Sequence, residues 1–175
     1  MARRRVAVIL GGRSSEHEVS VTSARNIMAA LDPERWEALP IGITKQGAWL
    51  SIAQTAELLA AGKRAIPDGG SPLLTSPALA DLASCVVAFP IVHGTFGEDG
   101  TLQGFLEMAD IPYAGAGVTA SAIGMDKALM KALFVEAGIP VAKYGVIRSW
   151  EYADAQNVVL YAEREVGYPC FVKPS

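Results

Sequence analysis

A continuous apolar run, Val6–Leu10, leads directly into Gly11-Gly12, and this feature constrains the fold more than any other. A strand that is apolar at every position is typical of a parallel sheet covered by helices on both faces, because an exposed face would carry alternating polar residues. A helix is predicted to follow by about residue 24. Its apolar stripe has helical spacing and consists of Ala24, Ile27, Met28 and Leu31. The order strand, tight turn, helix therefore predicts an α/β fold with a parallel sheet.

The alternation of strands and helices continues along the chain. A second long apolar run, Cys85–His93, ends at a glycine and contains Pro90. Because proline cannot donate a backbone hydrogen bond, this strand is expected to lie near an edge of the sheet or to be bulged. Leu39–Thr44 and Ala48–Ile52, on either side of Lys45-Gln46-Gly47, are predicted to form a hairpin. Shorter predicted elements are the helices Gln54–Ala61, Thr101–Ala109 and Val118–Ile123 and the strand Ile111–Ala114.

A second unit is predicted to begin near residue 120. Asp126 is a candidate N-cap of a helix, and Gly138 supplies its C-terminal stop. The strand Val141–Ile147, a helix capped by Ser149, and the strand Cys170–Val172 are predicted to follow. These elements make a small sheet without its remaining strands, which would leave an unpaired edge. The chain is therefore expected to be the N-terminal part of a longer protein, with domains over 1–120 and 121–175, the second incomplete.

Composition argues against several classes of protein. The 15 basic and 18 acidic residues give a net charge of −3, which does not suit a nucleic-acid binder that depends on bulk electrostatics. Cys85 and Cys170 are far apart in sequence and have no histidine at metal-ligand spacing, so buried reduced thiols are expected. The sequence shows neither a signal peptide nor a membrane-spanning segment, and a cytoplasmic protein is expected.

Two candidate site residues follow the long apolar runs, where ligands bind in doubly wound sheets. Glu16 lies in the loop after the first run, and His93 ends the second run beside three glycines in seven residues. Ser15 and Glu18 have capping-box spacing, which would leave Glu16 free to project, whereas a helix starting at Ser20 would leave Glu16 on the loop. From the residues alone, Glu16 is a capping or surface residue or a ligand-binding one, and His93 is structural or lines a pocket.

A second glycine-rich turn suggests another interpretation. The segment from Gly115 to Ala120 matches the dinucleotide-binding pattern G-x-G-x-x-[GA] after a strand. The acidic residue about 20 positions later is Glu136, which lies inside a predicted helix, whereas the pattern needs it at a strand end. A tight turn from strand to helix explains these residues adequately.

Two lysines of the second unit suit an anionic ligand. Lys127 lies in the first turn of its helix, where the macrodipole disfavours a cation unless an anion is bound. Lys173 follows the predicted strand, and a lysine on a buried strand needs an anionic partner. Each lysine alone is also explained by exposure to solvent, but the pair together favours a polyphosphate.

Four ordered blocks of sequence span the whole chain, and they are Val8–Ser20, His93–Gly104, Pro112–Lys127 and Phe171–Ser175. Taken together, they resemble the D-alanine–D-alanine ligases of peptidoglycan synthesis, members of the ATP-grasp superfamily. No single block would make the resemblance specific. It implies a Rossmann-like N-terminal domain with a parallel α/β sheet, followed by the truncated start of an ATP-grasp α+β domain.

The resemblance also implies roles for single residues. Glu16 would act as the catalytic and substrate-binding residue that holds the ammonium of the first D-alanine, and Val19 would line that site. His93 would lie near the carboxylate of the same substrate. Lys127 and Lys173 would bind the phosphates of ATP. The ligands of Mg²⁺ or Mn²⁺ are expected beyond residue 175, and none is assigned within the chain.

The implied reaction is the ATP-dependent ligation of two D-alanines through an acyl phosphate, carried out by a homodimer. Residues 1–175 alone are expected to be inactive, because the other substrate-binding residues of such enzymes would lie outside them. The alternatives are a related ligase that uses D-lactate or D-serine as second substrate, and a non-catalytic nucleotide-binding module. Neither a nucleic acid nor a membrane is an expected partner.

Overall fold

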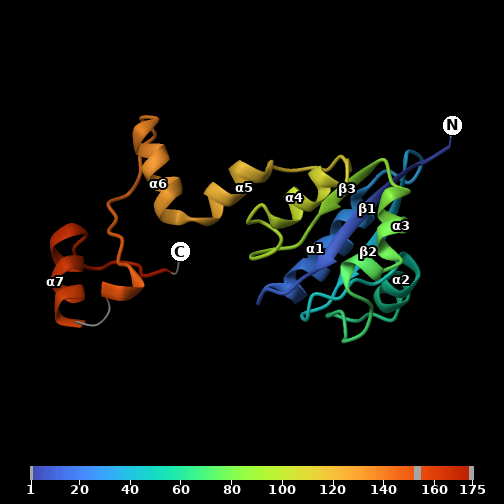
Figure 1. Cartoon of the computed structure of the whole chain (residues 1–175), viewed down its shortest axis with the longest axis horizontal. Coiled ribbons are helices and arrows are strands. Elements are labelled where there is room, and N and C mark those ends of the chain that lie inside the picture. The colour runs from blue at the N-terminus through green and yellow to red at the C-terminus, as the bar shows by residue number, and fades with distance from the viewer. Residues whose placement is uncertain (1, 152–154, 174–175) are drawn as a thin grey trace. The chain divides into compact units, whose positions relative to one another are not determined.

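The computed structural model describes residues 2–151 and 155–173, and the chain divides into two compact units, Met1–Ala122 and Ile123–Ser175 (Figure 1). The strands are β1 (Arg4–Gly11), β2 (Trp36–Ile43) and β3 (Val87–Pro90). The helices of the first unit are α1 (His17–Ala30), α2 (Ile52–Ala60), α3 (Ala78–Ala83) and α4 (Thr101–Met108), with the 3-10 turn η1 (Leu73–Thr75). They are followed by α5 (Val118–Met125), α6 (Lys127–Glu136), the 3-10 turn η2 (Ser149–Glu151) and α7 (Ala155–Glu165).

The three strands form a parallel sheet in the order β2-β1-β3. β1 is the central strand, pairing with β2 along its whole length and with β3 at residues 6–9. Pro90 is the last residue of β3, which lies at one side of this sheet, as expected for a residue that cannot donate to a ladder. The parallel sheet and its helices confirm the predicted α/β class.

Helices cover both faces of the sheet. One core cluster joins β1 to α3 and α4 and includes Ala7, Ile9, Leu82 and Leu106. The other joins β1 to α1 and includes Val8, Leu10, Val21 and Ala24. These side chains are fully buried, and each large aliphatic one contributes about 1.5–3 kcal/mol through removal from water. The unbroken apolar run of β1 therefore contributes alternate side chains to the cores on both faces of the sheet.

The predicted hairpin is confirmed only as a short antiparallel turn, in which the Thr44 N–H donates to the Ala48 carbonyl and the Leu50 N–H to the Gly42 carbonyl, both at 2.9 Å. Its first segment belongs to β2, which pairs in parallel with β1, and its second segment contributes only isolated bridges at Trp49. The physical reason is the capping box of Ser51 and Gln54, which starts α2 immediately after this point. The strand expected at 111–114 is likewise reduced to a single bridge, between Tyr113 and β3.

The helix predicted at the start of the second unit is confirmed. The Asp126 carboxylate accepts hydrogen bonds from the backbone N–H groups of Ala128 and Leu129, both at 3.0 Å, and thereby caps α6. Gly138 follows the helix with a φ of 71°, a left-handed conformation that suits glycine at a C-terminal stop.

The strands expected in the second unit are not formed. Residues 141–147 and 170–172 have no regular structure, because a strand needs a hydrogen-bonded neighbour and the described residues of this unit offer none. The helix expected to begin at Ser149 is described from Ala155 onward, and residues 152–154 lie outside the described ranges. No helix in the described ranges is long and apolar enough to cross a bilayer.

Candidate functional site

The carboxyl ends of β1 and β3 meet at one edge of the sheet, because the strands are parallel neighbours. Two hydrogen-bonded connections join the segments that follow them. Ser14 Oγ donates to the carbonyl of His93 at 2.6 Å. Ser20 Oγ donates to the carbonyl of Ile91 and accepts from the Gly11 N–H at 2.8 Å. The loop before α1 and the loop before α4 therefore form one surface.

Glu16 lies on this surface beside the second loop. A Cβ placed on Gly94 would lie 3.3 Å from Glu16 Oε2 and 3.0 Å from Ser14 Cβ, so the carboxylate reaches the backbone next to His93. Glu16 is the exposed N-cap residue of α1, yet its side chain makes no capping hydrogen bond. Val19, three residues later and 55% exposed, shares this face of the helix. The arrangement leaves the Glu16 carboxylate available to a ligand.

The capping box expected from Ser15 and Glu18 is wrong, as is a start of α1 at Ser20. α1 begins at His17, and the Glu18 carboxylate accepts a hydrogen bond from Lys45 Nζ at 2.6 Å. This bond holds the pKa of Glu18 below its ordinary value. The two neighbouring acidic residues therefore differ, since Glu18 has a cationic partner and Glu16 faces the second loop.

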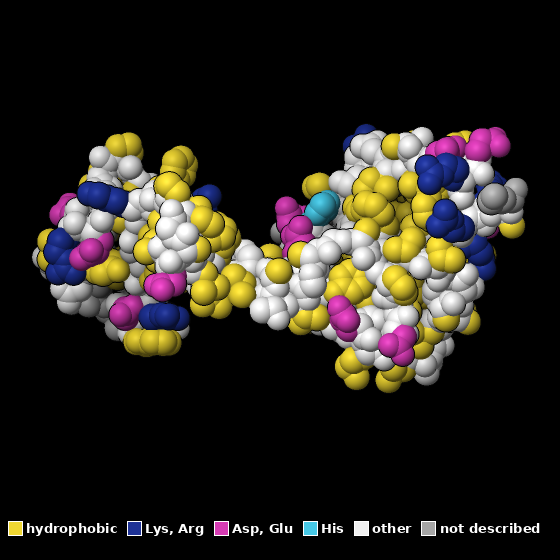
Figure 2. All heavy atoms as spheres, turned by 90° about the horizontal axis from the view of Figure 1, so that it is seen from above, with side chains coloured by type: hydrophobic (Ala, Val, Ile, Leu, Met, Phe, Trp, Pro, Cys, Tyr) yellow, Lys and Arg dark blue, Asp and Glu magenta, His cyan; other side chains and the backbone are white. Residues whose placement is uncertain are grey.

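His93 is held from two sides. Its Nδ1 lies 3.6 Å from Glu98 Oε1, and its Nε2 lies 3.4 Å from Ser23 Oγ on α1. The side chain is 31% exposed. Figure 2 shows a histidine side chain at the surface beside acidic side chains. The ring is thus anchored at the surface, near the Glu16 carboxylate.

The loop 94–100 is folded by its own carboxylates. Glu98 Oε2 accepts from the Gly94 N–H at 2.7 Å, and Asp99 accepts from the N–H groups of Phe96 at 2.8 Å and Thr101 at 3.0 Å. From α4, the Gln103 amide donates to the Gly97 carbonyl at 2.8 Å. Both acidic residues of this loop therefore support its backbone.

Asp99 makes this loop sensitive to acid. Partial burial alone would raise the pKa of Asp99, but the hydrogen bonds from Phe96 and Thr101 outweigh burial and the pKa lies below its ordinary value. The stabilisation is fully present above the unfolded pKa, about 3.9, and is lost as the pH falls through the lower folded value.

We therefore expect Asp99→Asn to lower the free energy of unfolding by about 1 kcal/mol or less near neutral pH, because the carboxylate is partly solvated. The difference from the wild type should shrink below about pH 4. Urea unfolding followed by circular dichroism across a pH series measures this. The exposed residue Asp68 offers a matched control, Asp68→Asn, and an Asp99→Asn effect that does not vary with pH would contradict the assignment.

Sequence reasoning missed His17, a structural residue within this site. The ring is fully buried; its Nδ1 donates to the Gly12 carbonyl at 2.7 Å and its Nε2 accepts from the Ile66 N–H at 2.9 Å. This pairing requires the neutral ring with its proton on Nδ1. A signal existed, because the buried residues of α1 are spaced i, i+3, i+4 and i+7: His17, Ser20, Val21 and Ala24.

The two lysines expected to bind phosphates lie in the second unit. Lys127 is exposed and is the first residue of α6, directly after its cap. Lys173 is exposed in a segment without regular structure, and the preceding Phe171 is 96% exposed. The expectation that Lys173 follows a buried strand is therefore wrong for this structure, while its proposed ligand stays a prediction.

The structure favours a tight turn over a dinucleotide-binding turn at Gly115. Gly115 leads into α5, and Ser121 Oγ donates to the Ala116 carbonyl at 3.2 Å, which fits a tight turn into a helix. Glu136 ends a helix and lies at no strand end, so the dinucleotide-binding pattern lacks its acidic partner.

Within residues 2–151 and 155–173, no group of three or more histidine, cysteine or acidic side chains could hold a metal ion.

The sequence of the first unit matches a family model described as the D-ala D-ala ligase N-terminus, over residues 5–116. The chain belongs to the D-alanine–D-alanine ligase family. Since the match covers more than half of the chain, the resemblance seen in the four ordered blocks is confirmed.

Relatives within this family match the second unit as well. The D-alanine–D-alanine ligase of Heliobacterium modesticaldum is 46% identical over 186 residues, and the match covers 100% of this chain and 50% of that protein. The solved D-alanine–D-alanine ligase of Coxiella burnetii is 32% identical with a TM-score of 0.69, covering 91% of this chain and 48% of that one. The VanG D-Ala:D-Ser ligase of Enterococcus faecalis is 30% identical with a TM-score of 0.72, covering 96% and 51%. The chain therefore spans about half the length of the curated relatives it matches.

Proposed function

We propose that this chain forms the substrate-binding half of an enzyme that joins two D-alanines in an ATP-dependent reaction for peptidoglycan synthesis. The observation that carries the proposal is the approach of Glu16 to the His93 loop at one edge of the sheet, in a member of this ligase family. Relatives with 43–46% identity bear the name of that reaction.

A zwitterionic amino acid needs one partner for its ammonium group and another for its carboxylate. The Glu16 carboxylate would bind the ammonium of the first D-alanine, because charge-assisted hydrogen bonds are stronger than neutral ones. The imidazole of His93, held by Glu98 and Ser23, would lie near the substrate carboxylate. Val19, exposed on the same face as Glu16, would line the site beside the methyl group.

The chemistry in this proposal begins with the carboxylate of the first D-alanine, which is a poor electrophile. Its oxygen takes the γ-phosphoryl group of ATP, giving an acyl phosphate and ADP. The amine of the second D-alanine then attacks the acyl carbon, forms the peptide bond and releases phosphate and a proton. The residues of this chain contribute by positioning the first substrate so that these steps occur within a bound complex.

The phosphates of ATP would be held from the second unit. Lys127 stands at the N-terminus of α6, where the helix dipole favours an anion, and Lys173 would supply a further exposed cation. Mg²⁺ or Mn²⁺, with ligands expected beyond residue 175, would neutralise phosphate charge when bound. We further propose that the enzyme is cytoplasmic and forms a homodimer.

The second substrate of the proposed enzyme is D-alanine, with D-lactate and D-serine as the alternatives. Curated relatives of 43–46% identity are named D-alanine–D-alanine ligases, which supports D-alanine, whereas the solved D-alanine–D-alanine and D-Ala:D-Ser ligases are about equally similar to this chain, at 32% and 30% identity. A non-catalytic nucleotide-binding module is less well supported, because the dinucleotide pattern lacks its acidic residue at a strand end.

A chimera tests the proposed activity. Residues 1–175 replace the matching half of the Heliobacterium modesticaldum ligase, and phosphate release and dipeptide formation are measured with ATP and D-alanine. We expect both products only when both ATP and D-alanine are present. Residues 1–175 alone should show no turnover.

The result of the chimera depends on whether it folds, so its circular dichroism and its cooperative unfolding are recorded first. A folded chimera that forms no dipeptide would contradict the proposed function. Turnover by residues 1–175 alone would contradict the division of the site between two halves.

A further inference from the structure

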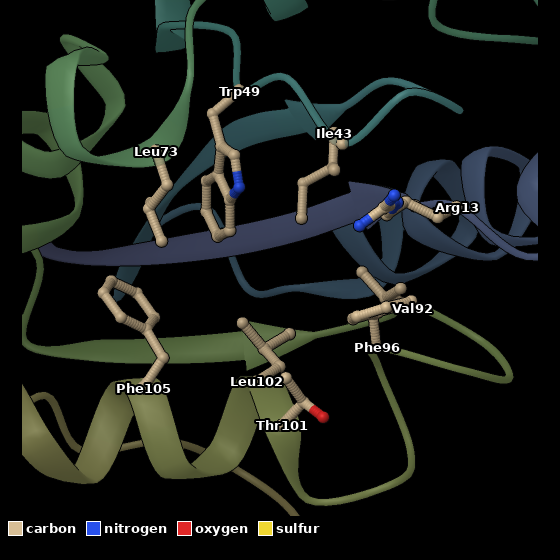
Figure 3. A pocket seen from close by; sticks show the side chains of 11 residues that line it. Arg13, Ile43, Trp49, Leu73, Val92, Phe96, Thr101, Leu102 and Phe105 are labelled. Carbon is tan, nitrogen blue, oxygen red and sulfur yellow. The ribbon is translucent and has the colours of Figure 1, made fainter.

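A pocket of ≈ 230 Å³ lies in the first unit, and its lining differs from the Glu16 and His93 surface. Its walls belong to the core cluster that α3 and α4 cover, whereas α1 packs on the other face of the sheet. In Figure 3, Trp49 and Leu73 face Phe105 across the pocket. None of the candidate substrate-binding residues lines it.

The interior of the pocket is apolar and aromatic, and its polar side chains are few. Trp49 and Phe105 are in contact edge to face, with ring centroids 6.0 Å apart. The polar side-chain groups of the lining are the Arg13 guanidinium, the Thr101 hydroxyl and the indole N–H of Trp49 (Figure 3). An apolar interior with a few polar groups at its border is typical of a small-molecule site.

Arg13 is held over the border of the pocket by two neighbours. Its guanidinium carbon lies 4.6 Å from the centroid of the Phe96 ring. A Cβ placed on Gly47 would come within 3.0 Å of Arg13 Cδ, so the side chain passes closely over this glycine. No acidic side chain pairs with Arg13 in the described ranges, although the guanidinium is exposed. The site thus carries a positive charge that lacks an anion.

Phe96 holds the ring beneath Arg13 through an unusual backbone. Its φ is 64°, in the left-handed region that bulky side chains rarely adopt, and the Asp99 carboxylate fixes this conformation by accepting its N–H at 2.8 Å. The side chain is nevertheless 46% exposed, so burial in the core does not explain its position. Phe96 and Arg13 together form a built entrance to the pocket.

We propose that this pocket binds a small carboxylate with a single aromatic ring. Apolar cavities of about 150 Å³ hold benzene, so ≈ 230 Å³ has room for one ring and a short substituent. The ring would pack against the edge-to-face pair of Trp49 and Phe105, and the carboxylate would pair with the guanidinium of Arg13. This inference goes beyond the proposed ligase function and does not depend on it.

Phenylacetate is the probe, and 2-phenylethylamine is its matched control, since it carries the same ring with the opposite charge. Binding to the 175-residue chain is followed by NMR through the indole N–H of Trp49, assigned with Trp36→Phe and Trp150→Phe. We expect phenylacetate to bind saturably with a millimolar dissociation constant. The dissociation constant of 2-phenylethylamine should be higher by a factor of about five or more. No ATP or D-alanine is present, so failure of the ligase proposal would not affect the result.

Arg13→Gln should weaken phenylacetate binding about fivefold, whereas Arg64→Gln, the same change of charge at an exposed loop residue, should leave it unchanged. Leu73→Trp fills the pocket and should abolish the Trp49 shift. If Leu73→Trp does not fold, the comparison of Arg13→Gln with Arg64→Gln still tests whether the carboxylate pairs with Arg13. Equal affinity for the acid and the amine, an unchanged affinity in Arg13→Gln, or no Trp49 shift in the wild type would each overturn the proposal.

Discussion

Glu16→Gln in the chimeric ligase should raise the Michaelis constant for the first D-alanine by about tenfold or more, because an ion pair with the substrate ammonium becomes a weaker neutral contact. The Glu16 side chain makes no capping hydrogen bond to α1, so the free energy of unfolding should stay close to the wild-type value. Steady-state kinetics with varied D-alanine and urea unfolding of the same preparations measure the two quantities.

Glu18→Gln is the matched control for this experiment. Glu18 lies two residues away on the same helix and is paired with Lys45, so its amide variant should leave the constant for D-alanine almost unchanged. A Glu16→Gln enzyme with wild-type affinity for D-alanine would exclude Glu16 from the site. An equal loss in both variants would point to a general change of charge at the start of α1.

Gly11→Ala should lower the free energy of unfolding of the chain by about 3 kcal/mol or more, through a left-handed backbone and severe overlap. Gly11 has a φ of 90°, and a Cβ there would lie 2.2 Å from the carbonyl oxygen of Ile43 and 3.0 Å from His17 Cε1. The first contact is with backbone, so relief requires separating the ends of β1 and β2. Urea or thermal unfolding followed by circular dichroism measures the loss.

Gly104→Ala provides the comparison for that substitution. Gly104 lies inside α4 with an ordinary helical backbone, and its added Cβ would meet only Val118 Cγ2, at 4.0 Å. Alanine should therefore stabilise the helix by up to about 1 kcal/mol. If both variants unfolded like the wild type, the close approach of Gly11 to β2 would be refuted.

The sequence predicted best those parts of the fold in which the apolar residues can be buried in a single arrangement. The run Val6–Leu10 is apolar on both faces, and only a central strand between two helical layers buries both. Parallel strands end at one edge, so the same pattern predicted that Glu16 and His93 would lie near each other. Their roles toward D-alanine stay predictions.

Other features depend on contacts that are distant in sequence, and these were missed. The turn at Lys45-Gln46-Gly47 forms, but the strand expected after it is cut short where Ser51 caps α2, and the parallel pairing of β2 with β1 has no local signal. The capping spacing of Ser15 and Glu18 is overridden by Lys45, which binds Glu18 from 27 residues away. The aromatic pocket joins segments from residue 12 to residue 105, and no local pattern indicates it.

The first two turns of α1 separate the residues that hold the fold from those that face outward. His17 and Ser20 use their polar atoms on backbone groups of neighbouring segments, while Glu16 and Val19 are exposed and leave those bonds untouched. Substitutions of the outward pair should therefore leave the hydrogen bonds that anchor α1 intact. Folding and surface chemistry are thus carried by different side chains of one short segment, so either can be altered by mutation without loss of the other.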